Sequence, residues 1–415
     1  MERRQARSGT LILGGGFAGS YVARLLGRRG ATIITPENSM LYTPLLPEAG
    51  AGTLEPRHVV VPLRQMCPHA ELLLGHVTGL DREQNVALAD TLAGPVEIGY
   101  ERLVVALGAV TRVLPIPGLR EHGLGFKDLA DAIALRNRIL LQLERASIRP
   151  EPAELGFVFV GAGYAGVEAL GELNDFAHAA LRHYPSLRGV PQRWVLVDAA
   201  PKILPEIPRR LGEYAARHLE RRRVEIHVGT TLESYDGREA VLANGLTIAA
   251  RTLVWTAGVR ANPILAGLGL PLDDRGRVQV GETLKVEGSD DTWALGDCAA
   301  VPNCKTPGVH DPPTCQHSLR QARRLAKNLT GTPRRYGYRM LGQVATLGRY
   351  KGIAEIPGMR LRGFLGWFVA RTYHLYQLPL LTRKLRVVAD WTVSLLFRRD
   401  IAELSVIGHP RKLGQ

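Results

Sequence analysis

The feature that most constrains this chain is a pair of glycine-rich turns, each directly after a run of apolar and β-branched residues. The first reads GTLILGGGFAGSYVARLL at residues 9–26, and the second reads FVFVGAGYAGVEAL at residues 157–170. Both contain G-x-G-x-x-G between a predicted strand and a predicted helix, formed by Gly14, Gly16 and Gly19 and by Gly161, Gly163 and Gly166. The first glycine permits the turn, the second lets the backbone approach a pyrophosphate, and the third lets helix and strand pack closely. Either copy alone would also suit a plain glycine turn, but two copies predict two dinucleotide-binding folds.

The acidic residue expected after each motif differs between the copies. The second copy reaches RWVLVD, an apolar strand that ends in Asp198. A carboxylate there would accept hydrogen bonds from a ribose and repel a 2′-phosphate, which favours NADH over NADPH. In the first copy the corresponding strand ends in Thr35, and Glu37 is either a ribose ligand or an acid of a surface turn. Two dinucleotide sites need a donor and an acceptor, which suits exchangeable NADH and tightly held FAD.

Length and composition agree with a folded, multi-domain chain. At roughly 100–200 residues per domain, 415 residues allow two or three domains. The predicted fold class is α/β, with two Rossmann-like dinucleotide-binding domains and a C-terminal membrane-associating region. Four cysteines are too few for a disulfide framework and indicate a reducing compartment. The start MERRQARSGT has no apolar run typical of a secretory signal, and no uninterrupted apolar stretch of about 18 residues predicts a spanning helix.

The positive charge of the chain is concentrated at one end. Residues 318–415 contain 19 Lys and Arg against four acids, whereas the preceding residues contain 34 against 35. Such an end indicates an anionic partner, either a membrane surface or nucleic acid, and no nucleic-acid-binding module accompanies it. Residues 383–400 place an apolar stripe at helical spacing between cations, which suits a helix lying in a membrane interface. The stripe contains Leu385, Val388, Trp391, Thr392 and Leu395. A helix packed on the protein's own body or on a dimer partner would show the same stripe.

Two further segments extend the first dinucleotide-binding fold. YERLVVALG, from Tyr100, is a buried strand ending in Gly108, and PIPG at 115–118 reads as a crossover out of that domain. VEGSDDTWALGD ends in Gly296 and Asp297, where an acid beside a glycine could bind a flavin ribityl or pyrophosphate group. Here the chain resembles the two-dinucleotide flavoproteins over nearly its whole length. In that family the chain leaves the FAD domain, builds the NADH domain and returns, so the resemblance implies a discontinuous first domain.

Within that group the sequence is similar to the type II NADH dehydrogenases, the single-subunit NADH:quinone oxidoreductases. The motifs that carry this resemblance are GGGFAG, LYTPLLPEAGAG at 41–52, GAGYAGVEALGEL at 161–173, LVWTAGVRANP at 253–263, ALGDCAAVP, PPTCQHSLRQARRLAKNL at 312–329 and ATLGRYKGIAEI at 345–356. The resemblance implies oxidation of NADH through FAD and transfer of electrons to a membrane quinone, without proton pumping.

The resemblance also assigns residues to the reaction. It implies that Glu168 lies near the nicotinamide and that Gln316 lies beside the flavin at the quinone entrance. As alternatives, Glu168 suits a first-turn helix acid and Gln316 a polar residue at a helix start. We add Lys384 as a candidate for stabilising quinol charge. The cofactor-binding residues are predicted to be Gly14, Gly16, Phe17, Ala18, Gly19, Glu37, Pro44, Val77, Ala106, Gly108, Gly296, Asp297 and Gln316 for FAD, and Gly161, Gly163, Tyr164, Gly166, Glu168, Asp198, Ala257 and Gly258 for NADH.

Three positions depart from the family pattern. The family usually has an acid where Thr35 stands, and Ala-Gln where this chain has Cys315 and Gln316. The second glutamine of the family's quinone motif meets Arg320, and Gln321 comes one place late. The first departure, Thr35, leaves open how the FAD ribose is bound, and the other two fall on the predicted quinone site.

Three cysteines and two histidines lie within residues 298–317, and this density leaves several functions open. Zinc ligands usually include the closer C-x₂₋₄-C spacing, which is absent, so no metal is predicted. A thiolate pair beside a flavin would suit a sulfide:quinone oxidoreductase, but the first glycine motif is followed by no C-x₄-C. Buried, inert cysteine is the third alternative. A soluble NADH-dependent flavin reductase or redox sensor is a further alternative function.

The predicted domains follow from these segments. They are an FAD-binding domain in two parts, 1–118 and 259–340, an NADH-binding domain at 119–258, and a membrane-associating region at 341–415. The predicted partners are a membrane quinone and anionic lipids at a membrane surface, but no nucleic acid; a homodimer is left open. The predicted location is the cytoplasmic side of the cell membrane, with peripheral attachment.

Overall fold

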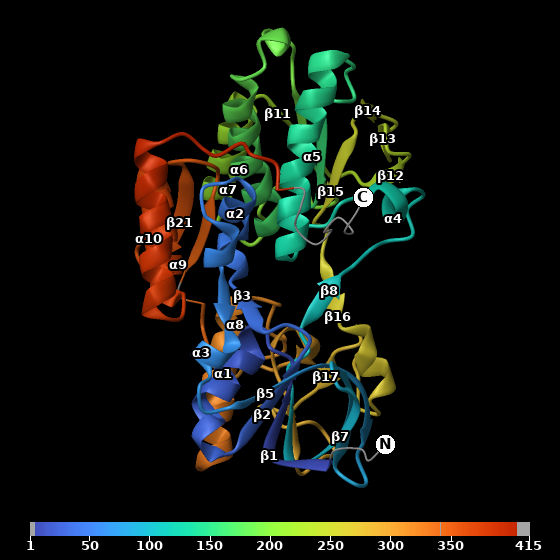
Figure 1. Cartoon of the computed structure of the whole chain (residues 1–415), viewed down its shortest axis with the longest axis vertical. Coiled ribbons are helices and arrows are strands. Elements are labelled where there is room, and N and C mark those ends of the chain that lie inside the picture. Colours follow the sequence, from blue (N-terminus) through green and yellow to red (C-terminus); the bar gives the residue numbers. More distant parts are fainter. Residues whose placement is uncertain (1–4, 341, 405–415) are drawn as a thin grey trace, which may run out of the picture. The chain divides into compact units, whose positions relative to one another are not determined.

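The computed structural model describes residues 5–340 and 342–404, and it divides into two compact units that are each assembled from three stretches of chain (Figure 1). Unit 1 contains residues 5–42, 60–110 and 259–340. Unit 2 contains residues 43–59, 111–258 and 342–404. The chain therefore passes from one unit to the other five times.

Unit 1 is built on a six-stranded sheet with the order β1–β2–β5–β6–β7–β18, in which β1 also pairs with β7. The pairs β1–β2, β2–β5, β1–β7 and β7–β18 are parallel, and β6 pairs antiparallel with both neighbours. Central β1 is buried at Leu11, Ile12 and Leu13, and α1 packs against both β1 and α8. The bounds are β1 (Gln5–Leu13), α1 (Phe17–Leu26), β2 (Ala31–Thr35), β5 (Glu71–Asp81), β6 (Val86–Thr91), β7 (Gly94–Val105), β18 (Thr292–Ala294) and α8 (Cys315–Thr330).

Short elements complete this unit. Two of the small sheets are the antiparallel pair β3–β4 and the parallel pair β17–β19, while β8 and β16 form a third. Their bounds are β3 (Ser39–Leu41), β4 (Val60–Pro62), α3 (Leu63–Met66), β8 (Ala109–Thr111), β16 (Val259–Ala261), β17 (Val278–Gln279) and β19 (Ala299–Ala300).

Unit 2 repeats the parallel arrangement with the strand order β11–β10–β9–β15. Its core joins this sheet to the antiparallel sheet β12–β13–β14 through buried Val158, Val195, Leu242 and Ile248. Helix α5 begins with a capping box, because Asp128 and Asp131 each accept a backbone N–H of the other. The bounds are α4 (Leu119–His122), α5 (Leu129–Ile148), β9 (Gly156–Val160), α6 (Tyr164–Leu181), β10 (Arg193–Asp198), α7 (Arg209–Arg221), β11 (Val224–Val228), β12 (Leu232–Tyr235), β13 (Glu239–Leu242), β14 (Thr247–Ala249) and β15 (Thr252–Trp255).

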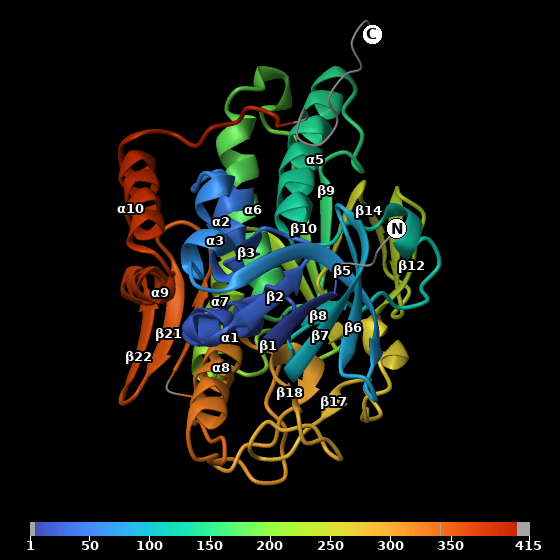
Figure 2. The same cartoon turned by 60° about the horizontal axis from the view of Figure 1, so that its bottom comes forward.

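The C-terminal residues form an antiparallel three-stranded sheet and two helices that also belong to unit 2. Helix α9 packs on β20, β21 and β22, and α10 follows it; both are red in Figures 1 and 2. The short helix α2, from the segment 43–59, packs against α5 and α6 in the same unit. The bounds are α2 (Leu46–Gly50), β20 (Gln343–Thr346), β21 (Gly352–Ile356), β22 (Met359–Gly363), α9 (Phe364–Gln377) and α10 (Leu381–Leu396).

The units divide the chain partly where the sequence predicts domain boundaries. The observed units and the predicted domains share the boundaries after residues 258 and 340. The boundary expected after residue 118 falls after residue 110, and residues 43–59 cluster with unit 2 rather than with unit 1. The C-terminal residues are part of unit 2 and not a separate body. The assignment of FAD to unit 1 and of NADH to unit 2 stays a prediction.

Candidate active site

The parallel strands of unit 1 end at one edge of the sheet, and the predicted FAD-binding segments follow directly from those ends. Leu13 at the end of β1 pairs with Val105 at the end of β7, and Val105 pairs with Ala294 at the end of β18. The residues that follow are Gly14, the segment Ala106–Gly108, and the pair Gly296 and Asp297. Ligands of open α/β sheets bind at this carboxyl edge. The fold therefore brings three distant predicted segments together.

The first glycine turn has two crowded positions and one open position. Gly14 has φ +108°, and a Cβ on it would overlap the carbonyl oxygen of Ala106. A Cβ on Gly19 would overlap the carbonyl oxygen of Gly14. By contrast, a Cβ on Gly16 would meet no atom within 4 Å. Protein packing explains why positions 14 and 19 are glycine, but it does not explain the glycine at position 16. The open space at Gly16 fits a bound pyrophosphate.

Gly296 brings a second turn close to this one. It has φ +75°, and a Cβ on it would lie 3.0 Å from the Cβ of Ala18. Its N–H donates to the side-chain oxygen of Gln321 at 2.8 Å, and the Gln321 amide nitrogen donates to Asp311 at 2.9 Å. Sequence reasoning missed this buried bridge and treated Gln321 only as a displaced motif residue. The signal that could have found it is a glutamine on the inner face of an amphipathic helix.

Asp311 is the acceptor of a buried polar cluster in unit 1. Its Oδ2 lies 2.6 Å from His317 Nδ1, and its Oδ1 accepts from Asn303 Nδ2 at 2.8 Å. Burial alone would raise the pKa of Asp311, but hydrogen bonds from His317, Asn303 and Gln321 lower it. An ionised carboxylate is thus held next to the N-terminal turn of α8.

The other residues predicted to bind FAD are distributed over both units. Phe17 begins α1, and its ring centroid lies 5.5 Å from that of Tyr42. Val77 is buried on β5, and Glu37 is exposed just after β2. Pro44 lies in the 3₁₀ turn Thr43–Leu45, in unit 2.

Thr35, the departure from the expected acid, has a packing role at the end of β2. It is buried, and a Cβ on Gly15 would lie 2.6 Å from its hydroxyl oxygen. The threonine therefore supports the glycine turn directly from the neighbouring strand.

The second glycine turn repeats the pattern of the first in unit 2. Gly161 has φ +111°, and a Cβ on it would lie 2.6 Å from the carbonyl carbon of Thr256; a Cβ on Gly166 would overlap the carbonyl oxygen of Gly161. A Cβ on Gly163 would meet no atom within 4 Å. Thr256, which the sequence did not single out, donates its hydroxyl to the carbonyls of Val160 at 3.0 Å and Gly161 at 2.9 Å. This open cradle fits a second pyrophosphate.

Three of the remaining residues predicted to bind NADH lie on elements around this turn. Tyr164 begins α6, while Ala257 and Gly258 follow the end of the neighbouring strand β15. Gly258 has φ +96°, which glycine adopts readily. The residues of the second motif and of β15 therefore share the carboxyl edge of one parallel sheet.

Asp198 lies at the end of β10 and binds the backbone of the second glycine turn. One carboxylate oxygen accepts the N–H of Ala162, and the other accepts the N–H of Ala200 at 2.7 Å. Beside this strand end is a hollow of about 230 Å³. Its lining residues are Ala199, Gly229, Thr230, Thr231, Ala243 and Asn244. Ala199, which follows Asp198 in the chain, thus lines a hollow at the edge where ligands bind, and the role of Asp198 in ribose binding stays a prediction.

Glu168 lies one turn into α6 and is held by Thr346 of β20. Its Oε1 accepts the backbone N–H of Thr346 at 2.9 Å and the Thr346 hydroxyl at 3.3 Å. Burial raises the pKa of Glu168 to about 8, and these two hydrogen bonds only partly oppose the shift. Near neutral pH the carboxyl is therefore mainly protonated, and it can hold or give up a proton.

The other two predicted catalytic residues are in different units. Gln316 is the second residue of α8 in unit 1, and its Oε1 accepts a hydrogen bond from the Tyr338 hydroxyl at 3.1 Å. Lys384 is in α10 of unit 2, where its ammonium donates to the carbonyl of Tyr376 at 2.7 Å. This bond ties α10 to the end of α9, and a role of Lys384 toward quinol stays a prediction.

The cysteines form no pair within the described ranges. All four are free, and burial raises the pKa of both Cys298 and Cys315 to about 11, so both are thiols at neutral pH. Among residues 5–340 and 342–404, no group of three or more His, Cys, Asp or Glu could hold a metal ion.

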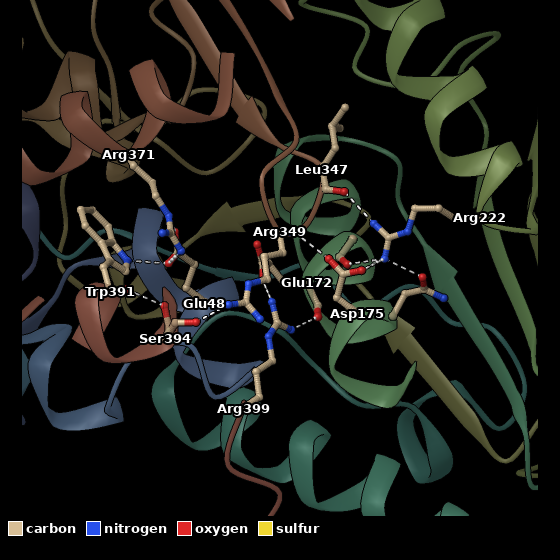
Figure 3. Close-up of polar contacts among 12 residues, drawn as sticks. Glu48, Glu172, Asp175, Arg222, Leu347, Arg349, Arg371, Trp391, Ser394 and Arg399 are labelled. Atoms are coloured by element: carbon tan, nitrogen blue, oxygen red, sulfur yellow. Dashed lines mark hydrogen bonds and ion pairs between the residues drawn. The ribbon is translucent and has the colours of Figure 1, made fainter. Parts of the chain in front are cut away.

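The C-terminal helices are bound to the rest of unit 2 by charged side chains that are buried (Figure 3). Arg371 binds both oxygens of Glu48, at 3.0 and 2.6 Å, and Trp391 donates its indole N–H to the same carboxylate at 2.7 Å. The guanidinium lies 4.2 Å from the ring centroid of Trp367 and 4.6 Å from that of Trp391. Glu48 therefore joins α2 to both C-terminal helices.

A second buried pair fixes the chain after α10. Arg399 donates to the Glu172 carboxylate at 2.7 Å and to the Glu172 carbonyl at 2.9 Å. Arg136 of α5 donates to the carbonyls of Asp400 at 2.6 Å and Ala402 at 3.1 Å. The chain after α10 is thereby held against α5 and α6.

The opposite side of the C-terminal helices is apolar and exposed. Leu385 is 60 % exposed, whereas Val387 two residues later is fully buried. Trp391 does not belong to the exposed stripe as expected, because its indole turns inward to Glu48. We call the exposed set the apolar face; it comprises Phe364, Leu365, Phe368, Tyr376, Leu381, Leu385, Val388, Val393, Leu395, Leu396 and Phe397. None of the helices within residues 5–340 and 342–404 is long and apolar enough to cross a membrane.

Two α/β units, each with a glycine turn open at its second glycine, define an oxidoreductase fold that binds two dinucleotides. The family model for pyridine nucleotide-disulphide oxidoreductases matches residues 9–322. A probable NADH dehydrogenase of Dictyostelium discoideum is 30 % identical over 412 residues, which cover 94 % of this chain and 90 % of that protein. The chain therefore belongs to the pyridine nucleotide-disulphide oxidoreductase family and, within it, to the type II NADH dehydrogenases.

Two further comparisons agree with this assignment. The type II NADH:quinone oxidoreductase of Mycobacterium tuberculosis is 30 % identical, over 95 % of this chain and 89 % of that protein. The structure of NDH2 from Plasmodium falciparum in complex with NADH superposes with a TM-score of 0.88. The superposition covers 96 % of this chain and all of that chain at 17 % sequence identity, so it shows that the two proteins share a fold. The predicted family and the α/β fold with two Rossmann-like domains are confirmed, and the membrane association of the C-terminal region stays a prediction.

Proposed function

We propose that this chain oxidises NADH through bound FAD and passes the electrons to a membrane quinone. In the overall reaction, NADH, one proton and a quinone give NAD⁺ and a quinol. The observation that carries the proposal is the pair of glycine cradles, each open at its second glycine and placed at the carboxyl edge of a parallel sheet. One electron donor and one acceptor would occupy two such sites. The family of the chain and the names of its relatives support this reading.

The residues of unit 1 bind and orient the flavin cofactor in this proposal. FAD, when bound, supplies the two-electron chemistry. The N–H groups at Gly16 and the N-terminus of α1 bind its pyrophosphate, because a helix start favours negative charge. Gly296 and Asp297 bind the ribityl or pyrophosphate region, and the bridge through Gln321 holds that turn in place.

The residues of unit 2 select and orient NADH. The N–H groups at Gly163 and the start of α6 bind its pyrophosphate. Asp198 accepts from a ribose hydroxyl and repels a 2′-phosphate, which favours NADH over NADPH. Glu168 is close to the nicotinamide in its protonated form, and Thr346 keeps its carboxyl in one position.

The apolar face is proposed to lie in the membrane interface. It runs along α9 and α10 and is bordered by the exposed cations Arg360, Arg362, Arg386 and Arg398. A helix with an exposed apolar face and flanking cations binds to the acyl boundary and to anionic headgroups. Attachment is then peripheral, on the cytoplasmic side, and Gln316 stays the residue proposed for the quinone.

The rival function as a sulfide:quinone oxidoreductase finds less support in the cysteines. That chemistry needs a reactive thiolate pair beside the flavin. The free thiols of Cys298 and Cys315 have a raised pKa, so burial suppresses the thiolate.

The test is anaerobic stopped-flow spectroscopy of the purified holoenzyme. NADH should bleach the flavin absorbance much faster than NADPH, since Asp198 would repel the 2′-phosphate, and sulfide should not bleach it. A soluble quinone should then restore the absorbance. Bleaching by sulfide but not by NADH would overturn the proposal, and so would failure of quinone to re-oxidise the flavin.

A further inference from the structure

Two glutamates one turn apart on α6 contact the C-terminal part of the chain in different ways. Glu168 accepts two hydrogen bonds from Thr346 of β20, whereas Glu172 is bound by Arg399, after α10. Residues four positions apart lie on the same face of a helix, with their Cβ atoms about 5–6 Å from each other. The charge of one carboxyl group can therefore change the proton affinity of the other.

The charge of Glu172 is set by its contact with Arg399. The guanidinium lies 2.7 Å from the carboxylate, and the two side chains are 3 % and 1 % exposed. Burial raises the pKa of Glu172, and the positive charge of Arg399 opposes this rise. Arginine stays charged in proteins, and a buried guanidinium needs an anion beside it. Glu172 supplies this anion, so it is ionised in the folded protein.

Glu168 has the opposite charge state. Burial raises its pKa to about 8 against two hydrogen bonds from Thr346, and the negative charges of Glu172 and Glu48 add to the rise. Glu48 has its own guanidinium partner, Arg371, at 2.6 Å, and Figure 3 shows both ion pairs. Three carboxyl groups thus share two guanidinium groups. Among the described residues, Glu168 is bound by Thr346 rather than by a guanidinium, so it is the carboxyl that keeps a proton near neutral pH.

Other titratable and charged groups act on this cluster from the elements around α6. They are Glu48 of α2, Arg136 of α5, Tyr164 and Asp175 of α6, Glu206, Glu355 of β21, Arg371 of α9, and Asp400. Among them, Tyr164 precedes Glu168 by one turn, and burial raises the pKa of its hydroxyl, so this neighbour is neutral. The test leaves all of these groups in place, and a change in the titration of Glu168 then reports on Glu172.

We propose that Arg399 is a positioning residue that keeps the proton on Glu168, and that it acts through the ionised carboxylate of Glu172. When the guanidinium is removed, Glu172 takes up a proton, because a buried carboxylate without a cation becomes neutral. Glu168 then loses a negative neighbour and gives up its own proton more readily. A cation that acted directly on Glu168 would have the opposite effect, since its loss would strengthen proton binding. For NADH oxidation the inference rests on the proposed function, in which Glu168 is close to the nicotinamide.

The test is an infrared pH titration of the FAD-containing protein that follows the C=O stretch of protonated carboxyl groups. The band that Glu168→Gln removes belongs to Glu168, and its midpoint in the wild type should lie at about pH 8. Arg399→Gln should lower this midpoint by about one pH unit, and Glu172→Gln should lower it at least as far. In the Arg399→Gln background, Glu172→Gln should have no further effect, because Glu172 is already neutral there.

Two other variants complete the design. Arg251→Gln is the matched control, because Arg251 also forms an ion pair with a buried glutamate of unit 2, Glu154, at 2.7 Å. It should leave the midpoint of Glu168 at the wild-type value. Arg399→Lys retains the positive charge and should keep the midpoint close to that of the wild type.

Glu172→Gln also protects the test against a folding defect of Arg399→Gln. It removes the same negative charge, but the bond from Arg399 to the backbone carbonyl of residue 172 can remain. A lower midpoint in this variant alone would show that Glu172 controls Glu168, and the wild-type midpoint would overturn the inference.

The outcomes separate this inference from the proposed function. An unchanged or higher midpoint of Glu168 in folded Arg399→Gln overturns the inference, and so does a further fall when Glu172→Gln is added. The titration contains neither NADH nor quinone, so these results do not depend on the proposed function. The proposed function requires in addition that the pH dependence of flavin bleaching by NADH moves with the infrared midpoint. If the midpoint falls and the bleaching profile stays in place, the coupling of the two glutamates is supported, and the proposed place of Glu168 at the nicotinamide fails.

Discussion

At the scale of single residues, Gly163 is the most informative position for the proposed NADH site. Its backbone is extended and a Cβ would meet no protein atom within 4 Å, so Gly163→Val should fold. The valine would occupy the space left for the pyrophosphate. We expect flavin bleaching by NADH to fall at least a hundredfold while bound FAD is retained, as measured by stopped flow and by flavin absorbance.

Gly16→Val is the matched control for this variant, because Gly16 is equally open in the first turn. It should lose bound FAD, which Gly163→Val retains. Unchanged NADH kinetics in Gly163→Val, or loss of FAD from that variant, would contradict the assignment of the second turn to NADH.

The pKa of Glu168 gives a prediction about pH and stability. A glutamate ordinarily titrates near 4.5, and in the folded protein Glu168 titrates near 8. Between these values the folded state binds more protons than the unfolded state, so the fold loses stability as the pH rises. Glu168→Gln stays neutral and should escape this loss, which amounts to at most ~4 kcal/mol.

The measurement for Glu168 is the melting temperature of wild type and Glu168→Gln between pH 5 and pH 8.5. The difference should grow in favour of the variant as the pH rises. A constant difference across this range would show that Glu168 is ionised in the folded protein at all these pH values.

Some residues of the candidate site could be predicted from the sequence and others could not. The glycine motifs are local, since strand, turn and helix lie within about 20 residues. Thr256 and Thr346 act on residues that are 95 and 178 positions away, and no local pattern marks either one. The bridge from Gln321 to Gly296 and Asp311 likewise forms only when α8 packs beside the turn after β18.

At the scale of elements, α10 shows what periodicity can and cannot decide. The sequence predicts an amphipathic helix at residues 383–400, and the structure has one at Leu381–Leu396. The predicted exposed stripe wrongly included Trp391. Its indole N–H binds the carboxylate of Glu48, 343 positions away in the chain, so the side chain turns toward the protein. Apolar spacing therefore gives the helix, and long-range polar contacts decide which side faces the protein.

The exposed apolar side of α10 leads to a prediction about membrane binding. Leu385→Asp and Leu396→Asp place charges on the apolar face without touching the contacts of Glu48. Each leucine that no longer enters the lipid reduces the free energy of membrane binding by about 1.5–3 kcal/mol. The double variant should therefore bind vesicles with anionic headgroups at least tenfold more weakly than the wild type. Sedimentation with vesicles measures this binding.

Ile148→Asp is the matched control for the vesicle experiment, since Ile148 is also an apolar, exposed residue of a unit 2 helix, at the end of α5. It should bind vesicles like the wild type. If the α10 variant also binds like the wild type, a different surface contacts the membrane.

At the scale of the whole molecule, the sequence predicted the two nucleotide-binding folds and the return of the chain to the first. It did not predict that residues 43–59 cluster with unit 2. That segment is joined to the C-terminal helices by Glu48 and Arg371, 323 positions apart, and by His58 and Asp390, 332 positions apart. Sequence motifs describe neighbours along the chain, whereas these pairs exist only after the last helices have folded.

The late position of the arginine partners has a consequence for synthesis on the ribosome. Unit 1 is fully encoded by residue 340, but the buried carboxylates of Glu48 and Glu172 in unit 2 wait for Arg371 and Arg399. A buried carboxylate without its cation is strongly destabilising. A nascent chain halted after residue 340 would thus contain all residues of unit 1, whereas unit 2 would carry buried carboxylates without their arginine partners. Folding of unit 2 can therefore be completed only when the C-terminal residues leave the ribosome.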